Sequence, residues 1–165
     1  MTTTTPLRWA DADDPIASRM IFVSATADAR ERNQLVPAWN LYQGGCLPLL
    51  RERLAKHPRH RGRVRLISAE YGLLHPHTQV PPSISRMSVK RAGQLRPRAC
   101  RALMDEVSRH GVPLEVMMLA EHPYHLVVTD LYDIPGMQPH TSLRTPLPGE
   151  HWSLIAAVLD TWGWP

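Results

Sequence analysis

The chain has 165 residues, of which 43% are hydrophobic and 21% are charged, and its formal net charge is +4. This length is typical of one domain and can bury a core without disulfide bonds or a structural metal, while the composition excludes a disordered chain. No run approaches the roughly 18 apolar residues of a membrane helix. The cysteines Cys46 and Cys100 lack the spacing of a zinc site and do not form a secreted disulfide framework. We expect a cytoplasmic protein that makes no membrane contact.

The first half of the chain alternates strand and helix signals. The apolar run at residues 20–25 predicts a strand covered on both faces, and the leucine spacing at residues 47–57 predicts a helix. Residues 64–68 predict a second strand, followed at once by Gly72 and a turn rich in proline and histidine.

The second half begins with the longest predicted helix, at residues 88–110. Ser88 is a good N-cap for it, and Pro97 inside it predicts a kink or two abutting helices. Residues 114–119 predict a third strand, and residues 123–133 give a weaker helix signal because β-branched residues interrupt it.

The end of the chain completes the alternation. A short extended segment at residues 141–144 leads into a last helix, which buries residues at helical spacing: Trp152, Ile155, Ala156, Leu159 and Trp162. This order predicts an α/β fold, a Rossmann-like three-layer αβα arrangement with a mostly parallel sheet of about four strands. We expect one domain at residues 18–165, preceded by a flexible lead-in at residues 1–17.

Polar residues follow each of the three predicted strands. In open parallel sheets, ligands bind beyond the carboxyl ends of the strands, so these positions are the first candidates for a site. The polar residues there are Ser24, Ser68, Glu70, Tyr71, Glu121, His122 and Tyr124.

Four short motifs occur in one order along the chain: Leu41-Tyr42-Gln43-Gly44, the segment Ser68-Ala69-Glu70-Tyr71-Gly72-Leu73-Leu74, Arg86-Met87, and Pro146-Leu147-Pro148-Gly149. This order resembles the YaaA-like family, in particular the small phage and actinobacterial branch related to the peroxide-stress protein YaaA. The resemblance spans roughly residues 20–162, and the second motif is its most specific part.

The chain departs from the family's pattern at two places, as a divergent member would. Ala25 stands where the family has a cysteine, and no lysine follows through Asn33. Pro82-Ser83-Ile84 replaces the family's Pro-Tyr-Asp element.

The resemblance implies a protein that handles nucleotides or nucleic acids, including hypermodified or deazaguanine bases and DNA modification. We therefore expect an enzyme that acts on a nucleoside or nucleotide at its N-glycosidic bond. Breaking a base–sugar bond develops positive charge on the sugar, which a nearby carboxylate stabilises while an acid protonates the leaving base. Glu70 is the first candidate for the carboxylate, with Glu121 or His122 as the acid–base partner.

The remaining candidates would bind the substrate. Tyrosine rings can stack on a base, an arginine can grip a phosphate with two hydrogen bonds, and a serine at a strand end suits a phosphate oxygen. These candidates are Ser24, Tyr42, Ser68, Tyr71, Arg86 and Tyr124. Each also has a structural interpretation, such as a packed turn or an ion pair.

The alternative is a non-catalytic protein that binds a nucleotide or nucleic acid through a basic patch. Seven basic residues and one acid lie between Arg51 and Arg65, and such a patch attracts phosphates. The two departures from the family's pattern favour this alternative. The tryptophans Trp152, Trp162 and Trp164 could form an exposed apolar patch for a homodimer.

The nine histidines give no metal signature. His75 and His77, and likewise His122 and His125, are closely spaced, but no third ligand of clear spacing accompanies either pair. We expect no metal and no cofactor.

Overall fold

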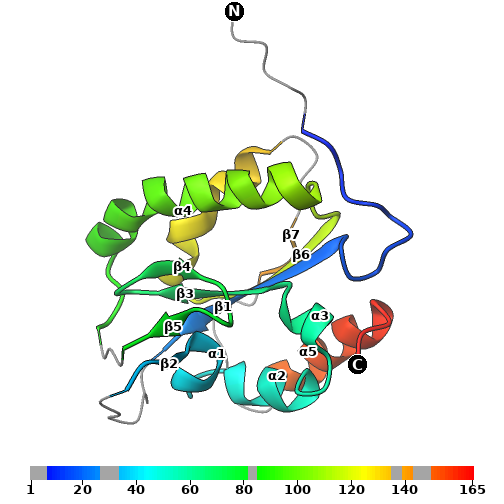
Figure 1. Cartoon of the computed structure of the whole chain (residues 1–165), viewed down its shortest axis with the longest axis horizontal. Helices are drawn as coiled ribbons and strands as arrows, with labels where there is room; N and C mark the ends of the chain where they lie inside the picture. Colours follow the sequence, from blue (N-terminus) through cyan, green and yellow to red (C-terminus); the bar gives the residue numbers. More distant parts are fainter. Residues whose placement is uncertain (1–6, 27–33, 82–84, 135–138, 143–149) are drawn as a thin grey trace, which may run out of the picture.

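The mixed α/β fold is built around a five-stranded, mostly parallel sheet (Figure 1). The structure is a computed structural model, and it describes residues 7–26, 34–81, 85–134, 139–142 and 150–165. The strands lie in the order β4-β3-β1-β6-β7. They are β1 (Arg19–Ala25), β3 (Val64–Ser68), β4 (Gly72–Leu74), β6 (Glu115–Leu119) and β7 (Pro139–Ser142). All pairs are parallel except β3–β4, and a separate antiparallel pair joins β2 (Val36–Pro37) to β5 (Gln79–Val80).

The central strand β1 is buried on both of its faces. Every residue from Met20 to Ala25 is buried, as the unbroken apolar run predicts. Because successive side chains of a strand point to opposite faces, Met20 and Phe22 belong to one hydrophobic cluster, and Ile21 and Val23 belong to the other. The core therefore has two halves, one on each side of the sheet.

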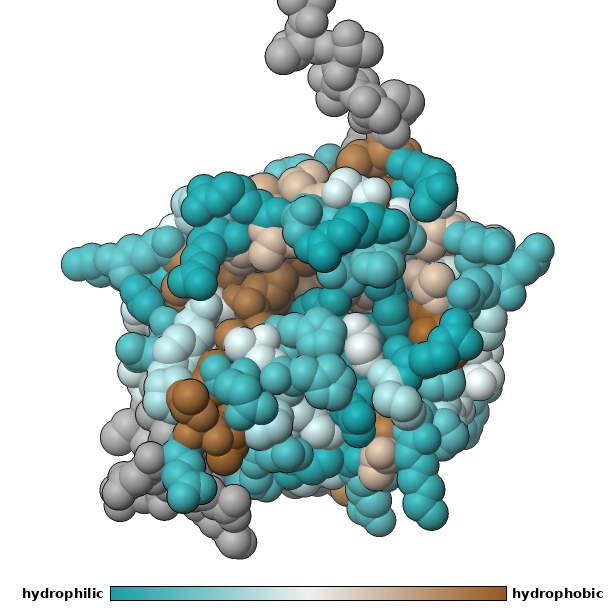
Figure 2. All heavy atoms as spheres, in the orientation of Figure 1, coloured by the Kyte–Doolittle hydropathy of each residue, from teal (hydrophilic) through white to brown (hydrophobic). Residues whose placement is uncertain are grey.

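Helices cover both faces of the sheet (Figure 1). On one face pack α4 (Val89–His110) and the 3-10 helix η1 (Tyr124–Asp133). On the other face pack α1 (Ala38–Leu41), α2 (Leu47–Arg53) and α5 (Glu150–Thr161), while α3 (Pro58–Arg61) follows α2 and buries none of its residues. The face of the molecule in Figure 2 is mostly hydrophilic, with apolar side chains visible only in small areas.

The long helix agrees with its prediction in start, end and length. Its N-cap is Ser88, whose Oγ accepts a hydrogen bond from the Arg91 amide at 3.1 Å, and Gly111 follows its last residue with φ of +85°. Of the two alternatives expected at Pro97, a kink or two abutting helices, the second is wrong, because α4 continues through this residue as one helix.

Other boundaries differ from the sequence analysis. The helix predicted at residues 47–57 ends at Arg53, and Pro58 begins α3 instead. The turn expected after β3 begins as the strand β4, which pairs back onto β3. The helix signal at residues 123–133 corresponds to η1, in which Val128 has non-helical backbone angles. Of the extended segment expected at residues 141–144, the strand β7 includes 141 and 142, and the rest lies outside the described residues.

The tryptophan patch expected at the end of the chain is wrong. Trp162 and Trp164 are each only 4% exposed and belong to the core cluster that packs beneath α5, and Trp152 is half-buried against the same cluster. Trp164 also donates a hydrogen bond to the Pro15 carbonyl at 2.8 Å. These rings therefore stabilise the core of the chain itself.

Residues 7–17, which the sequence analysis places in a lead-in, contact the end of α4. The Val112 amide donates to the Arg8 carbonyl at 2.8 Å, and the Ala10 amide donates to the Val112 carbonyl at 2.9 Å. Gly111 makes this approach possible, because a Cβ there would lie 2.7 Å from the Ala10 nitrogen.

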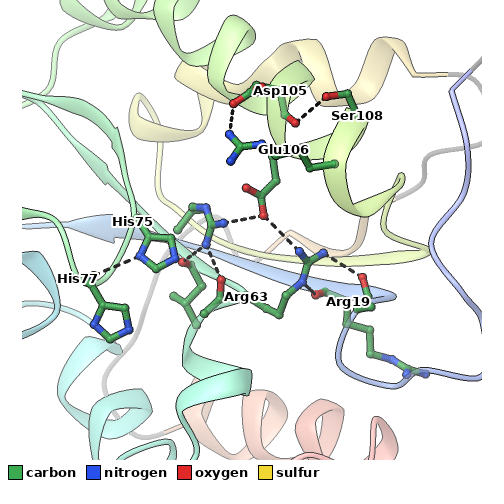
Figure 3. A network of polar contacts seen from close by, with 12 residues as sticks. Arg19, Arg63, His75, His77, Asp105, Glu106 and Ser108 are labelled. Atoms are coloured by element: carbon green, nitrogen blue, oxygen red, sulfur yellow. Dashed lines mark hydrogen bonds and ion pairs between the residues drawn. The ribbon is translucent and has the colours of Figure 1, made fainter. Parts of the chain in front are cut away.

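A buried ion network joins α4 to the beginnings of β1 and β3 (Figure 3). One oxygen of Glu106 accepts from Arg63 at 3.2 Å and from Arg65 at 2.6 Å. Arg63 also donates to the carbonyls of Arg19 and Ala17, at 3.0 and 2.9 Å. Burial acts to raise the pKa of Glu106, but the charges of Arg65 and Arg63 outweigh it and hold that pKa below its ordinary range.

No helix in the part of the chain that the structure describes could span a lipid bilayer.

Gly111→Ala is expected to lower the free energy of unfolding by roughly 1–3 kcal/mol, because a side chain is strained at positive φ and would displace the Ala10 backbone. Gly93→Ala in α4 is the matched control. A Cβ there meets no atom within 4 Å, so this change should stabilise the helix by up to about 1 kcal/mol. Urea denaturation of both variants checks the pair, and equal effects would contradict the role assigned to Gly111.

Stability between pH 6.5 and 4 should depend on His75. Burial, with a smaller effect from Arg65, lowers the pKa of His75 from 6.5 to about 4. As the pH falls below 6.5, the unfolded chain binds this proton first, so the folded state loses stability until about pH 4. In the variant His75→Gln, the urea concentration at the midpoint of unfolding should therefore fall less than in the wild type as the pH is lowered from 6.5 to 4. His77→Gln, on the neighbouring histidine, should leave the wild-type slope. A wild-type slope in His75→Gln would contradict the account.

Candidate functional site

The parallel pairing brings three strand ends to one edge of the sheet. Ala25 at the end of β1 lies opposite Ser68 at the end of β3, and Val23 lies opposite Leu119 at the end of β6. The polar residues that follow these strands are therefore neighbours, as the sequence analysis predicts for a parallel sheet. A direct link is the hydrogen bond from the Glu121 amide to Ser24 Oγ at 3.2 Å.

A pocket of about 370 Å³ opens at this edge, between the end of β6 and the approach to α4. Its size is within the range of small-molecule sites. It is lined by Thr26, Arg86, Met87, Glu121, His122, Pro123 and Tyr124. We call it the Glu121 pocket. It brings together four of the predicted site residues, which supply a carboxylate, an imidazole, a phenol and a guanidinium.

Tyr124 forms the buried wall of the Glu121 pocket. The residue is only 6% exposed, and burial raises the pKa of its hydroxyl. A backbone hydrogen bond from Met87 and the charge of Arg86 act in the opposite direction, while the charge of Glu121 adds to the rise. The phenol therefore stays protonated at neutral pH and can donate a hydrogen bond to a ligand.

Ser68 holds the turn after β3 from within the core. Its Oγ accepts from the amides of Glu70 and Tyr71, each at 3.2 Å, and lies 3.1 Å from the hydroxyl of Tyr42. Tyr42 is 3% exposed, and burial raises the pKa of its hydroxyl. Ser68 and Tyr42 thus position the site from below, and neither lines the Glu121 pocket.

Glu70 lies on the exposed turn beside the pocket and not among its lining residues. Its carboxylate accepts from Ser85 Oγ at 2.6 Å, and Arg91 donates to the carbonyls of Ala69 and Glu70 at 2.8 and 2.9 Å. The Tyr71 hydroxyl donates to the Pro81 carbonyl at 3.3 Å. The structure therefore separates Glu70 and Tyr71 from the pocket that contains Glu121 and His122.

The two groups of residues remain within electrostatic reach of each other. The charge of Glu70 and the hydroxyls of Tyr71 and Tyr124 each contribute to the raised pKa of Tyr42. Tyr42 thus lies within electrostatic range of residues from both groups.

Most of the basic residues between Arg51 and Arg65 bind other parts of the chain. Arg51 donates to the Trp39 carbonyl at 2.8 Å, and Arg53 pairs with Asp160 and with the carbonyl of Pro165. Arg61 donates to the Ala55 carbonyl, and Arg63 and Arg65 belong to the Glu106 network. Lys56 and Arg59 are exposed. The predicted basic patch therefore consists largely of internal contacts.

Several residues of the site were not predicted. Thr26 and Met87 line the Glu121 pocket, and Ser85 and Arg91 hold the Glu70 turn. Thr26 had a usable signal, since it follows the first strand, and Arg91 lies three residues after the N-cap Ser88. Met87 belongs to the Arg86-Met87 motif but was not named as a site residue. Ser85 had no signal, because only the fold brings it to this edge.

Within the described residues, no three side chains of histidine, cysteine, aspartate or glutamate gather in a way that could hold a metal ion. The rings of His122 and His125 lie 5.5 Å apart, and those of His75 and His77 lie 5.3 Å apart.

Ser68→Ala is expected to lower the free energy of unfolding by about 1–3 kcal/mol, because it removes the acceptor of two amides and the partner of a buried phenol. Ser24→Ala removes the acceptor of one amide and should cost less. Tyr42→Phe should cost about 1 kcal/mol, since Ser68 keeps its two amide bonds. Thermal and urea denaturation give the order, and a larger loss for Ser24→Ala would contradict the role of Ser68.

Comparisons of the chain with protein-family models, with curated proteins and with solved structures find no match. The arrangement of the site's own residues is therefore the basis for assigning a function.

Proposed function

We propose that the Glu121 pocket binds a nucleoside or nucleotide and that the chain acts on its base–sugar bond in the cytoplasm. The observation that carries the proposal is one small pocket, at the carboxyl edge of a mostly parallel sheet, that gathers Glu121, His122, Tyr124 and Arg86. Nucleotides bind at this edge in Rossmann-like three-layer folds, the class to which we assign the chain. The resemblance to the YaaA-like family supports the same class of ligand.

The chemistry needs a carboxylate and an acid on the two sides of the scissile bond. In the proposed reaction the carbon–nitrogen bond breaks, its electron pair stays on the base nitrogen, and that nitrogen takes a proton from His122. Water adds to the sugar carbon and gives a proton to the Glu121 carboxylate, which also stabilises the positive charge that develops on the sugar.

The structure favours Glu121 over Glu70 as this carboxylate. Glu121 lines the pocket together with His122, while Glu70 is exposed and accepts a hydrogen bond from Ser85. We therefore assign Glu70 and Tyr71 to the rim of the site, where they support the turn after β3.

Two further residues would orient the substrate. The Tyr124 ring can lie against the base or sugar, and its hydroxyl can donate a hydrogen bond. The exposed Arg86 can hold a 5′-phosphate through two parallel hydrogen bonds. Ser24, expected to bind a phosphate oxygen, accepts a hydrogen bond from the Glu121 amide and so holds the backbone at the start of this turn.

The alternative, a protein that only binds nucleic acid through the residues from Arg51 to Arg65, has less support from the geometry. Six of the seven basic residues there are engaged by carbonyls or carboxylates of the chain itself. Cations that are each bound to a different part of the chain do not form the continuous exposed basic surface that a nucleic-acid backbone needs.

Glu121→Gln is expected to reduce base release by about 100-fold or more while leaving ligand affinity nearly unchanged, because the amide keeps the shape but loses the charge. The assay incubates the wild type with a panel of nucleosides and nucleotides, including deazaguanine derivatives, and detects free base by chromatography. Glu70→Gln is the matched control and should retain activity within a few-fold.

Two results would contradict the proposal. Loss of activity in Glu70→Gln with full activity in Glu121→Gln would move the chemistry to the turn after β3. Binding of oligonucleotides alone, weakened by salt and without release of base from any compound, would favour the nucleic-acid-binding alternative.

A further inference from the structure

A second pocket, of about 560 Å³, opens around the Glu106 network at the opposite edge of the sheet (Figure 3). The pocket is lined by residues just before β3 and just after the antiparallel strand β4. The end of α4 and the segment that precedes β1 complete the lining. We call it the arginine pocket. It shares no residue with the Glu121 pocket.

The lining of the arginine pocket carries more positive than negative charge. Arg63 and Arg65 lie at its base and are each only 7% exposed. Both donate to the same oxygen of Glu106, so one carboxylate faces two guanidinium groups. Arg59 and Arg109 add two exposed cations at the rim.

Among the described residues that line the pocket, Asp14 is the one other acid. Asp105, outside the lining, pairs with Arg109, so four arginines meet three carboxylates. Asp14 lies 3.9 Å from Arg59, but the same carboxylate also accepts from the amides of Ile16 and Ala17. It is therefore a weak competitor for the cations at the rim.

Hydrogen-bond donors remain at the base of the pocket. Bonds to the described residues engage three N–H groups of Arg63, and a guanidinium carries five. His75 Nδ1 accepts from the His77 amide at 3.3 Å, which leaves the proton of the neutral ring on Nε2 as a further donor.

We propose that the arginine pocket binds a phosphate dianion, either inorganic phosphate or the terminal group of a small phosphate monoester. The excess of arginines over carboxylates attracts an anion. Its oxygens match the forked donors of the guanidinium groups, and the partly buried pocket strengthens the attraction. This site is separate from the proposed reaction at the Glu121 pocket and does not depend on it.

The test is calorimetric titration of the whole chain with inorganic phosphate and with methyl phosphate, at neutral pH and constant ionic strength. Arg59→Gln and Arg109→Gln remove rim cations that are exposed, so both variants should fold. Each should weaken phosphate binding by roughly 3- to 10-fold. Lys56→Gln, which removes an exposed cation outside the pocket, is the matched control and should change the affinity less than about twofold.

Tighter binding of methyl phosphate than of phosphate would identify a monoester as the ligand, and the reverse order would identify the free ion. The proposal is overturned if neither compound binds the wild type up to about 10 mM. It is equally overturned if Lys56→Gln weakens binding as much as the rim variants do, since that would show general attraction to a basic surface. Neither failure bears on base release at the Glu121 pocket.

Discussion

The burial of β1 between two parallel partners is the constraint on which the site depends. A strand that is covered on both faces and paired on both edges cannot shift or reverse without repacking both halves of the core and breaking the pairing with both neighbours. With β1 fixed in this way, β3 and β6 run beside it in the same direction. The polar residues that follow the three strands then meet at one edge, although nearly 100 positions separate Ser24 from Glu121.

The two edges of the sheet differ in how charge is arranged. At the amino edge, Glu106 and two arginines bind each other and the carbonyls that begin β1, so the ions hold the helix and the strands together. At the carboxyl edge, serine hydroxyls accept from backbone amides and thereby fix the turns. The carboxylate of Glu121 is left to line a pocket. The ion pairs that hold the helix and strands together thus lie at the amino edge, and the polar groups at the carboxyl edge can meet a ligand.

The parts of the fold that the sequence predicts well are those with strong local signals. The strands at β1, β3 and β6 are unbroken apolar runs, and α4 combines a serine N-cap, helical spacing and a terminal glycine. The strands β2, β4 and β5 were missed, because each has two or three residues and exists only through its partner. Long-range pairing of this kind leaves no periodic pattern in the sequence.

The candidate site was predicted in part. The rule that ligands bind at strand ends identified Glu121, His122 and Tyr124, which line one pocket. Glu70, in the most specific motif, was ranked first as the carboxylate, since spacing along the chain does not show that its side chain turns toward Ser85 at the surface. The basic patch was overestimated for a related reason, because counting charges does not reveal which arginines bind buried carbonyls.

The most direct test of the central claim is an NMR titration of the labelled chain with ribonucleosides that carry no phosphate, so that the arginine pocket gives no response of its own. The account predicts amide shifts concentrated at residues 86–87 and at Glu121, His122 and Tyr124, with the beginnings of β1 and β3 unchanged. Shifts that avoid the Glu121 pocket, or no shifts with any base, would contradict the assignment of this pocket to a nucleoside.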